Sequence, residues 1–149
     1  MDRIERKAEL AYPVERVWRA LSDAQEFGAW FRVGLTEPFR VGAEAAGPIT
    51  WPGMGHVTWR ATIVALDAKR RFAFRWHPDA IDPAVDYSAE ATTLVEFALE
   101  ATEGGTRLTL TETGFDALPE ARREEAYSRH EGGWTVQMGN IAAWLGEKA

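Results

Sequence analysis

The stretch from Pro119 to Gly146 constrains the fold more than any other, because its spacing predicts one long C-terminal helix. Apolar side chains recur in it at steps of four, three and four residues, at Trp134, Met138, Ile141 and Leu145. Tyr127 lies one heptad before Trp134 and extends the same stripe. Such spacing places the apolar groups on one helix face, which must be buried against another apolar surface.

The surface that can cover this helix comes from the segment between Phe39 and Thr113, where apolar and polar residues alternate as they do in half-buried strands. The pattern predicts strands at 39–45, 56–66 and 71–76, with a break at Gly47-Pro48 and a short resumption at 49–51. A hairpin follows, with its turn at 103–105. We therefore expect a curved antiparallel sheet that grips the helix.

The N-terminal third adds a strand and two short helices. Residues 4–10 alternate with period two, and Pro13 stands where a helix can begin. Asp23 and Glu26 have the spacing of a capping box, which predicts the start of a second helix. Gly28 is expected to end that helix. The fold class is thus α+β, with the two short helices after the first strand.

Residues 77–90 lack any periodicity and contain two prolines and four acidic residues. This composition predicts a long exposed loop. Since no linker or repeat is visible elsewhere, we expect residues 1–149 to form a single domain.

Composition excludes several classes of function. The formal net charge of −6 argues against a nucleic-acid partner, and no apolar run is long enough to span a membrane. No signal peptide is expected at the N-terminus. The absence of cysteine excludes thiol chemistry and fits a reducing, cytoplasmic compartment. Seven Trp and seven Phe are, by contrast, a large aromatic content that suggests a bulky core or an apolar pocket.

Four segments resemble a known family: 11–21 (AYPVERVWRAL), 29–31 (AWF), 72–76 (FAFRW) and the helix from Glu131-Gly132-Gly133-Trp134 to Trp144-Leu145. With the order of elements, they make the chain similar to the activator of heat-shock protein 90 ATPase homologue-like branch of the START and birch-pollen-allergen-like superfamily. This resemblance implies a helix-grip fold with a hydrophobic cavity between helix and sheet. It also implies binding of apolar small molecules, while some relatives are aromatase or cyclase enzymes.

The same resemblance brings in a heat-shock chaperone as a conceivable partner. The co-chaperone that gives the branch its name has a further N-terminal domain, which we do not expect here. A chaperone partner therefore has no support in this sequence, and the protein is expected to be a monomer or a weak homodimer.

Aromatic residues of the predicted sheet and helix are the candidate ligand-binding site. They are Trp30, Trp59, Phe74, Trp76, Trp134 and Met138. A packed core is the simpler interpretation of their periodicity. Three glycines in the helix favour a cavity instead, because each costs roughly 1 kcal/mol relative to alanine and so suggests a need for space; they are Gly132, Gly133 and Gly139.

No catalytic or metal-binding motif is recognisable. His77 lies near the acidic residues of the loop, but their spacing matches no ligand set, so neither a metal nor a cofactor is expected. His130 is more simply an exposed helix histidine, although acid–base work with a pocket carboxylate is conceivable.

Three functions remain open from the sequence. The favoured one is non-enzymatic binding of a hydrophobic or aromatic small molecule. An enzyme of the cyclase or dehydratase kind would need an ionisable group inside the cavity, for which Glu131, His130 and Glu112 are candidates. A chaperone-associated interaction module would need an exposed apolar patch on the outer face of the sheet, where the sequence has Arg and Thr.

Overall fold

A computed structural model describes residues 2–148. Its elements, in chain order, are β1 (Arg3–Leu10), α1 (Val14–Ser22), α2 (Ala24–Phe31), β2 (Glu44–Pro48), β3 (Thr58–Asp67), β4 (Arg71–Trp76), β5 (Thr93–Thr102), β6 (Gly105–Thr113), a 3₁₀ turn η1 (Phe115–Ala117) and α3 (Glu120–Glu147). The strands form one antiparallel sheet in the order β1-β6-β5-β4-β3-β2. The predicted α+β helix-grip architecture is confirmed.

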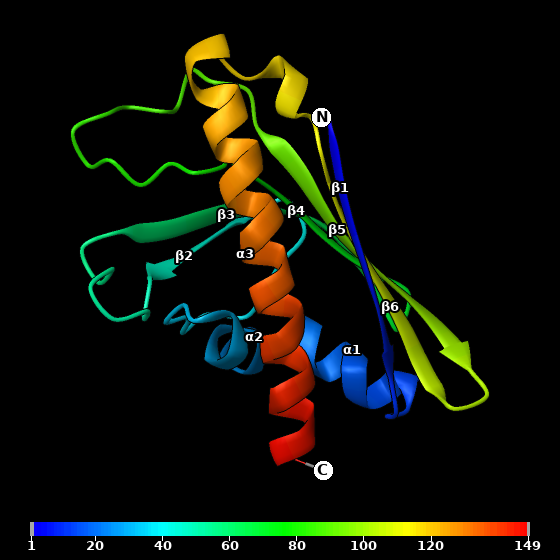
Figure 1. The fold of residues 1–149 in the computed structure, drawn as a ribbon. Coiled ribbons are helices and arrows are strands. Elements are labelled where there is room, and N and C mark those ends of the chain that lie inside the picture. The colour runs from blue at the N-terminus through cyan, green and yellow to red at the C-terminus, as the bar shows by residue number, and fades with distance from the viewer. Residues whose placement is uncertain (1, 149) are drawn as a thin grey trace.

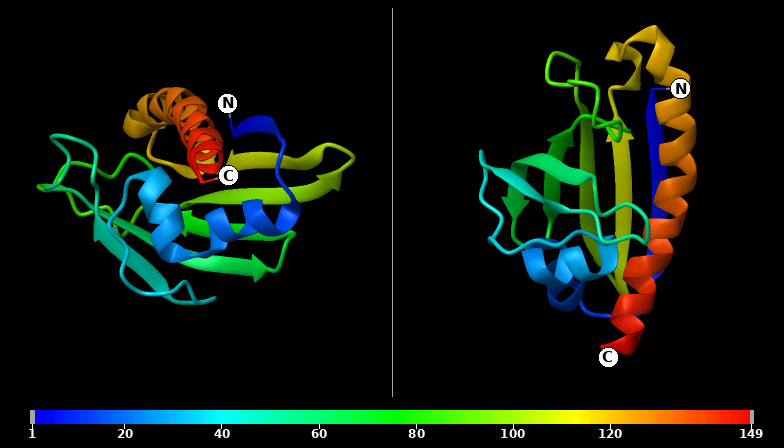
Figure 2. Two further views of the ribbon diagram at one scale, coloured as in Figure 1. Left: turned by 90° about the horizontal axis from the view of Figure 1, so that it is seen from below. Right: turned by 90° about the vertical axis from the view of Figure 1, so that its left-hand side faces the viewer.

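The sheet curves around the helices (Figures 1 and 2). α3 runs along the sheet beside β1, and α1 and α2 lie across the end of the sheet near the C-terminus of α3 (Figure 1). Loop 77–90, between β4 and β5, projects at the opposite end beside the start of α3. The two ends of the concave face are therefore covered by different parts of the chain.

α3 has nearly the predicted bounds, because Pro119 precedes its first turn and the apolar stripe is continuous. Trp134, Ile141 and Leu145 are buried, whereas Tyr127 and Met138 are partly buried at the margin of the stripe. The outward-facing residues between them are exposed. The stripe thus fixes which face of the helix meets the sheet.

β3 shows the predicted alternation. Trp59, Ala61 and Ile63 are buried, and the intervening polar residues are exposed on the outer face. A bulge between Ile63 and Ala65 shifts the register with β4. Bulges increase the local twist of a strand and so contribute to the curvature of the sheet.

The strand predicted at 39–45 is wrong, since β2 spans Glu44–Pro48 and contains the expected break. Gly47 is needed there because a Cβ atom would lie 2.1 Å from the carbonyl oxygen of Gly34. Pro48 is tolerated because β2 is an edge strand. Gly47 thus marks a close approach of two chain segments, and the strand ends one residue later at Pro48.

The predicted end of α2 at Gly28 is also wrong. The side chain of Asp23 caps the helix as expected, accepting a hydrogen bond from the backbone N–H of Glu26 at 3.0 Å. The helix then continues to Phe31 and ends at Arg32, which adopts a left-handed conformation with φ of 75°. Gly28 is required for a different reason, because a Cβ atom would lie 2.3 Å from the carbonyl oxygen of Val33.

Phenylalanine fills the end of the core that α1 and α2 cover. Phe27 is fully buried, and its ring lies 4.7 Å from that of Phe31, 5.5 Å from Phe72 and 5.6 Å from Phe39, measured between centroids. Most of these contacts are edge-to-face, the geometry that aromatic pairs prefer. These side chains fill the core at this end of the concave face.

Candidate functional site

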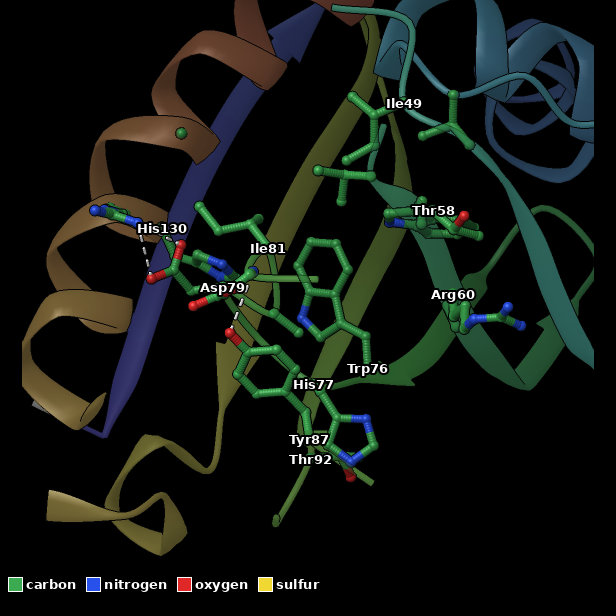
Figure 3. A pocket seen from close by; sticks show the side chains of 18 of the residues that line it. Ile49, Thr58, Arg60, Trp76, His77, Asp79, Ile81, Tyr87, Thr92 and His130 are labelled. Carbon is green, nitrogen blue, oxygen red and sulfur yellow. Dashed lines mark hydrogen bonds and ion pairs between the residues drawn. The ribbon is translucent and has the colours of Figure 1, made fainter. Parts of the chain in front are cut away.

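A cavity of about 980 Å³ lies at the other end of the concave face. Its walls come from α3 between residues 129 and 137, from β3 and β4, from the segment between residues 49 and 57, and from loop 77–90. Figure 3 shows side chains from the strands, the loop and α3 converging on this space. A volume of this size accommodates a drug-sized molecule.

The structure divides the six residues predicted to bind a ligand into two groups. Trp59, Trp76 and Trp134 line the cavity. Trp30, Phe74 and Met138 are not among its lining residues. They belong to the packed region, where the first two are buried and Met138 is partly buried.

Three of the four tryptophans that line the cavity form a continuous aromatic surface, and Trp51 is the fourth. The ring centroid of Trp76 lies 6.3 Å from that of Trp59 and 5.8 Å from that of Trp134. The imidazole of His130 lies 5.2 Å from Trp76 on the same wall. A planar aromatic guest can be buried against this surface with little loss of side-chain freedom.

Glu112 is the polar centre behind that wall, and its side chain is fully buried. One oxygen, Oε1, accepts hydrogen bonds from Nδ1 of His130 at 2.7 Å and from Nε1 of Trp134 at 2.8 Å. The other, Oε2, accepts from Nε1 of Trp76 at 2.7 Å and from Oγ1 of Thr93 at 2.5 Å. A carboxylate offers about four acceptor positions, so its capacity is used in full.

These donors decide the charge of Glu112. Burial alone would raise the pKa of this carboxyl group, but the hydrogen bond and the positive charge that His130 can supply, with the bonds from Thr93 and Trp134, lower the pKa below its ordinary value. Glu112 is therefore a buried carboxylate at neutral pH. It holds the side chains of β4, β5 and α3 together beneath the aromatic wall.

The tautomer of His130 follows from the same bonds. An ionised carboxylate only accepts hydrogen bonds, so Nδ1 of His130 carries the hydrogen that points at Glu112. The ring is also held between Trp76 and Phe115, whose centroids lie 5.2 and 5.9 Å away. The simpler interpretation of His130 as an exposed helix histidine is wrong, since only 14% of its side chain is exposed.

The sequence did contain a signal for Glu112. In β6 it follows Leu108 and Leu110 at the same parity, so the strand alternation places a charged residue on the buried face. A charge at such a position is rarely tolerated without partners. Glu131, the third candidate group, is exposed on α3 and does not line the cavity.

Loop 77–90 is fastened to α3 by two arginines. Arg122 bonds to Oε1 of Glu90 at 2.6 Å and to the carbonyl oxygen of Pro78 at 3.0 Å, and its guanidinium lies 4.7 Å above the ring of Tyr87. Arg129 pairs with Asp79 at 3.1 Å. The predicted exposed loop is present, and it forms one wall of the cavity.

One polar atom near the cavity lacks a partner. Nε1 of Trp59 is buried without a hydrogen-bond acceptor within the part of the chain that the structure describes. Buried indole N–H groups normally find an acceptor. Trp59 lines the cavity, so a ligand acceptor is one way to satisfy it.

The described residues contain neither a metal-binding cluster nor a membrane-spanning helix. Across residues 2–148, there is no cluster of three His, Cys, Asp or Glu side chains arranged to hold a metal ion. Over the same range, no helix has the length and apolar character needed to cross a bilayer.

Six antiparallel strands curved around a long C-terminal helix, with an aromatic cavity between them, define a helix-grip protein of the START and birch-pollen-allergen-like class. The family model for activator of Hsp90 ATPase homolog 1-like protein matches residues 11–146. The chain belongs to this family. None of the curated proteins compared with it matches.

Solved structures share the fold at low sequence identity. Protein MLL2253 of Mesorhizobium loti superposes with a TM-score of 0.77 at 20% identity, over 99% of this chain and 98% of that one. Protein NE0264 of Nitrosomonas europaea superposes with a TM-score of 0.76 at 20% identity, over 99% of this chain and 96% of that one. DynU16, a protein from the dynemicin biosynthetic locus, superposes with a TM-score of 0.73 at 21% identity. The match covers 97% of this chain and 47% of DynU16.

Proposed function

We propose that the protein binds a mostly apolar, planar aromatic small molecule in the cavity between β3, β4 and α3. The observation that supports this proposal best is a volume of about 980 Å³ with four tryptophans among its lining residues, Trp51, Trp59, Trp76 and Trp134. Burial of apolar area contributes about 25 cal/mol per Å², so stacking on these rings would supply most of the affinity.

The three helix glycines provide a direct test. Gly133 lines the cavity, and no atom lies within 4 Å of the position its Cβ would take. Gly133→Leu should therefore fill part of the cavity without a clash in the folded protein. Titration with the neutral naphthalene dye Prodan should give enhanced fluorescence with the native protein and an affinity at least about tenfold lower with the variant.

Gly132→Leu is the matched control. Gly132 is the adjacent residue of the same helix, has equally open surroundings and does not line the cavity. Its replacement should leave dye binding unchanged. Equal dye affinity in the native protein and both variants would contradict the proposed site.

Native mass spectrometry of freshly purified protein would address the natural ligand. A co-purifying mass that is lost in Gly133→Leu but retained in Gly132→Leu would identify the ligand class. DynU16 belongs to a locus for the biosynthesis of dynemicin, which suggests natural-product-like compounds for the first screen.

A second candidate function is an enzyme of the cyclase or dehydratase kind. The observation that favours it is the hydrogen bond between Glu112 and His130, because an acid or base at the cavity wall is what such chemistry requires. Turnover of a bound compound, followed by mass spectrometry of the incubated complex, separates this candidate from simple binding.

A further inference from the structure

The imidazole of His130 lies beside Trp76 on the aromatic part of the cavity wall. Charged and polar side chains line other parts of the cavity, among them Arg75, Asp82 and Tyr87. Nδ1 of His130 donates to Glu112, so Nε2 is left without a hydrogen in the neutral side chain. Among residues 2–148, Nε2 makes no hydrogen bond, and His130 lines the cavity. The wall thus presents a proton acceptor to whatever the cavity holds.

Glu112 and two aromatic rings hold the imidazole of His130 in place. The carboxylate of Glu112 lies 2.7 Å behind the ring and would stabilise the positive charge of an imidazolium. Packing between Trp76 and Phe115 fixes the ring, so the acceptor is oriented before a ligand arrives. A full set of donors on Glu112 keeps the negative charge in place.

The cationic residue that precedes His130 in α3 is already paired, whereas Arg75, Asp82 and Asp86 line other parts of the cavity. Arg129 precedes His130 in α3 and bonds to Asp79 of loop 77–90 at 3.1 Å and to Glu125. Among the described residues, Glu112 from β6 is the charged side chain that bonds to His130. β4 and η1 face the ring with Trp76 and Phe115, which carry no charge. Glu112 is therefore the charged group in direct contact with the imidazole.

We propose that the ligand is a planar aromatic compound with an acidic hydroxyl group, a phenol or an enol, and that Nε2 of His130 takes its proton. This inference rests on the proposed binding function and names the chemical class of the ligand. The O–H bond breaks, its electron pair stays on the oxygen and the proton forms the new N–H bond. The bound state is an oxyanion beside an imidazolium, with Glu112 still ionised behind it.

A matched pair of dyes tests the proposal. 7-Hydroxycoumarin and 7-methoxycoumarin have nearly the same shape, but only the first can give up a proton, and its anion absorbs at longer wavelength. The hydroxyl compound should bind about tenfold or more tightly than the methoxy compound, since a hydrogen bond between charged groups is stronger than a neutral one. At a pH where the free dye is mostly neutral, the bound dye should show the anion absorption band.

His130→Asn removes the acceptor but keeps an amide N–H near the position of Nδ1 to bond with Glu112. This variant should bind the two coumarins equally tightly and should show no anion band. Its affinity for 7-methoxycoumarin should match that of the native protein. Glu131→Gln is the control, because Glu131 is the next residue of α3, is exposed and does not line the cavity. It should behave like the native protein.

The outcomes separate the two proposals. Equal binding of both coumarins by the native protein, or an anion band that persists in His130→Asn, would overturn the role of His130 and leave the binding function intact. Failure of either coumarin, and of Prodan, to bind would overturn the binding function itself. If His130→Asn does not fold, the two coumarins compared on the native protein alone still decide the first question.

Discussion

The two ends of the concave face use aromatic residues in opposite ways. Beneath α1 and α2, Phe27 and its phenyl neighbours pack against one another, with centroid separations from 4.7 Å upwards. At the other end, Trp76 and Trp134 border an open volume. Phenyl rings are positioned only by contact, so they fill space, whereas an indole N–H bonded to a fixed acceptor can hold its ring at the edge of a cavity.

Two glutamates make the comparison sharper, because each accepts an indole N–H from α3 at 2.8 Å: Glu26 from Trp144 and Glu112 from Trp134. The remaining side-chain partners of Glu26 are Arg16 and Arg19, which stay charged at any physiological pH. Glu112 has a histidine instead. One site is a permanent ion-pair cluster, and the other can change its protonation state.

The largest expected effect distinguishes the packed end from the open end. Phe27→Ala should lower the free energy of unfolding by about 3–5 kcal/mol, because the ring is fully buried among close neighbours. Phe31→Ala is the same change in the same helix, but Phe31 borders the cavity, so less new enclosed void is formed. Urea denaturation should show the smaller loss for Phe31→Ala, and the reverse order would contradict the comparison.

The second-largest expected effect is the difference in stability loss between substitutions of the two glutamates. Glu112→Gln should lower the free energy of unfolding by about 2–4 kcal/mol, since the new amide N–H groups would face buried donors and leave some unpaired. Glu26→Gln should cost about 1–2 kcal/mol, because Glu26 retains some exposure and 62% of the Arg19 side chain is in solvent. Equal losses in chemical denaturation would show that burial does not separate the two sites.

Acid titration should reveal both carboxylates together. The pKa of Glu26 is lowered because bonds from Trp144, Arg16 and Arg19 outweigh the effect of its burial, and that of Glu112 is lowered by His130 and its other donors against a similar effect of burial. The unfolded chain then binds more protons than the folded chain. Their contribution to stability is complete above the unfolded value near 4.5 and is lost as the pH falls through the lowered values.

The unfolding free energy should therefore decline below about pH 4.5, by at most about 1.4 kcal/mol per pH unit for each group. Glu112→Gln should flatten this decline, as thermal denaturation at several pH values can measure. A decline of unchanged steepness in that variant would assign the acid sensitivity to other groups.

The smallest predicted effect concerns glycine. Gly132→Ala and Gly139→Ala should each stabilise the protein by about 0.5–1 kcal/mol, because nothing lies within 4 Å of the added Cβ and alanine favours the helix. Gly28→Ala is the control from the packed end, where the Cβ would lie 2.3 Å from the carbonyl oxygen of Val33, so it should destabilise. Melting temperatures that move in the same direction for all three variants would contradict this distinction.

Periodicity was sufficient to predict α3, β3 and β4, because burial of one face decides those elements. It failed at Gly28 and Gly47, where glycine is required by a backbone from elsewhere in the chain. It also could not separate Trp76 on the cavity wall from Phe74 in the core, since both face the same side of β4. Whether a cavity exists depends on how completely the side chains fill the core, and residue spacing does not encode this.

Because Glu112 joins donors from β4, β5 and α3, the four positions that bond to it are coupled energetically as well as joined in space. Replacing one donor frees an acceptor position, and the penalty for replacing a second then depends on how the carboxylate has readjusted. Strong epistasis should follow: paired substitutions at Trp76 and His130 would depart from the sum of the single ones. Replacing the glutamate itself would leave all four donors to find new acceptors.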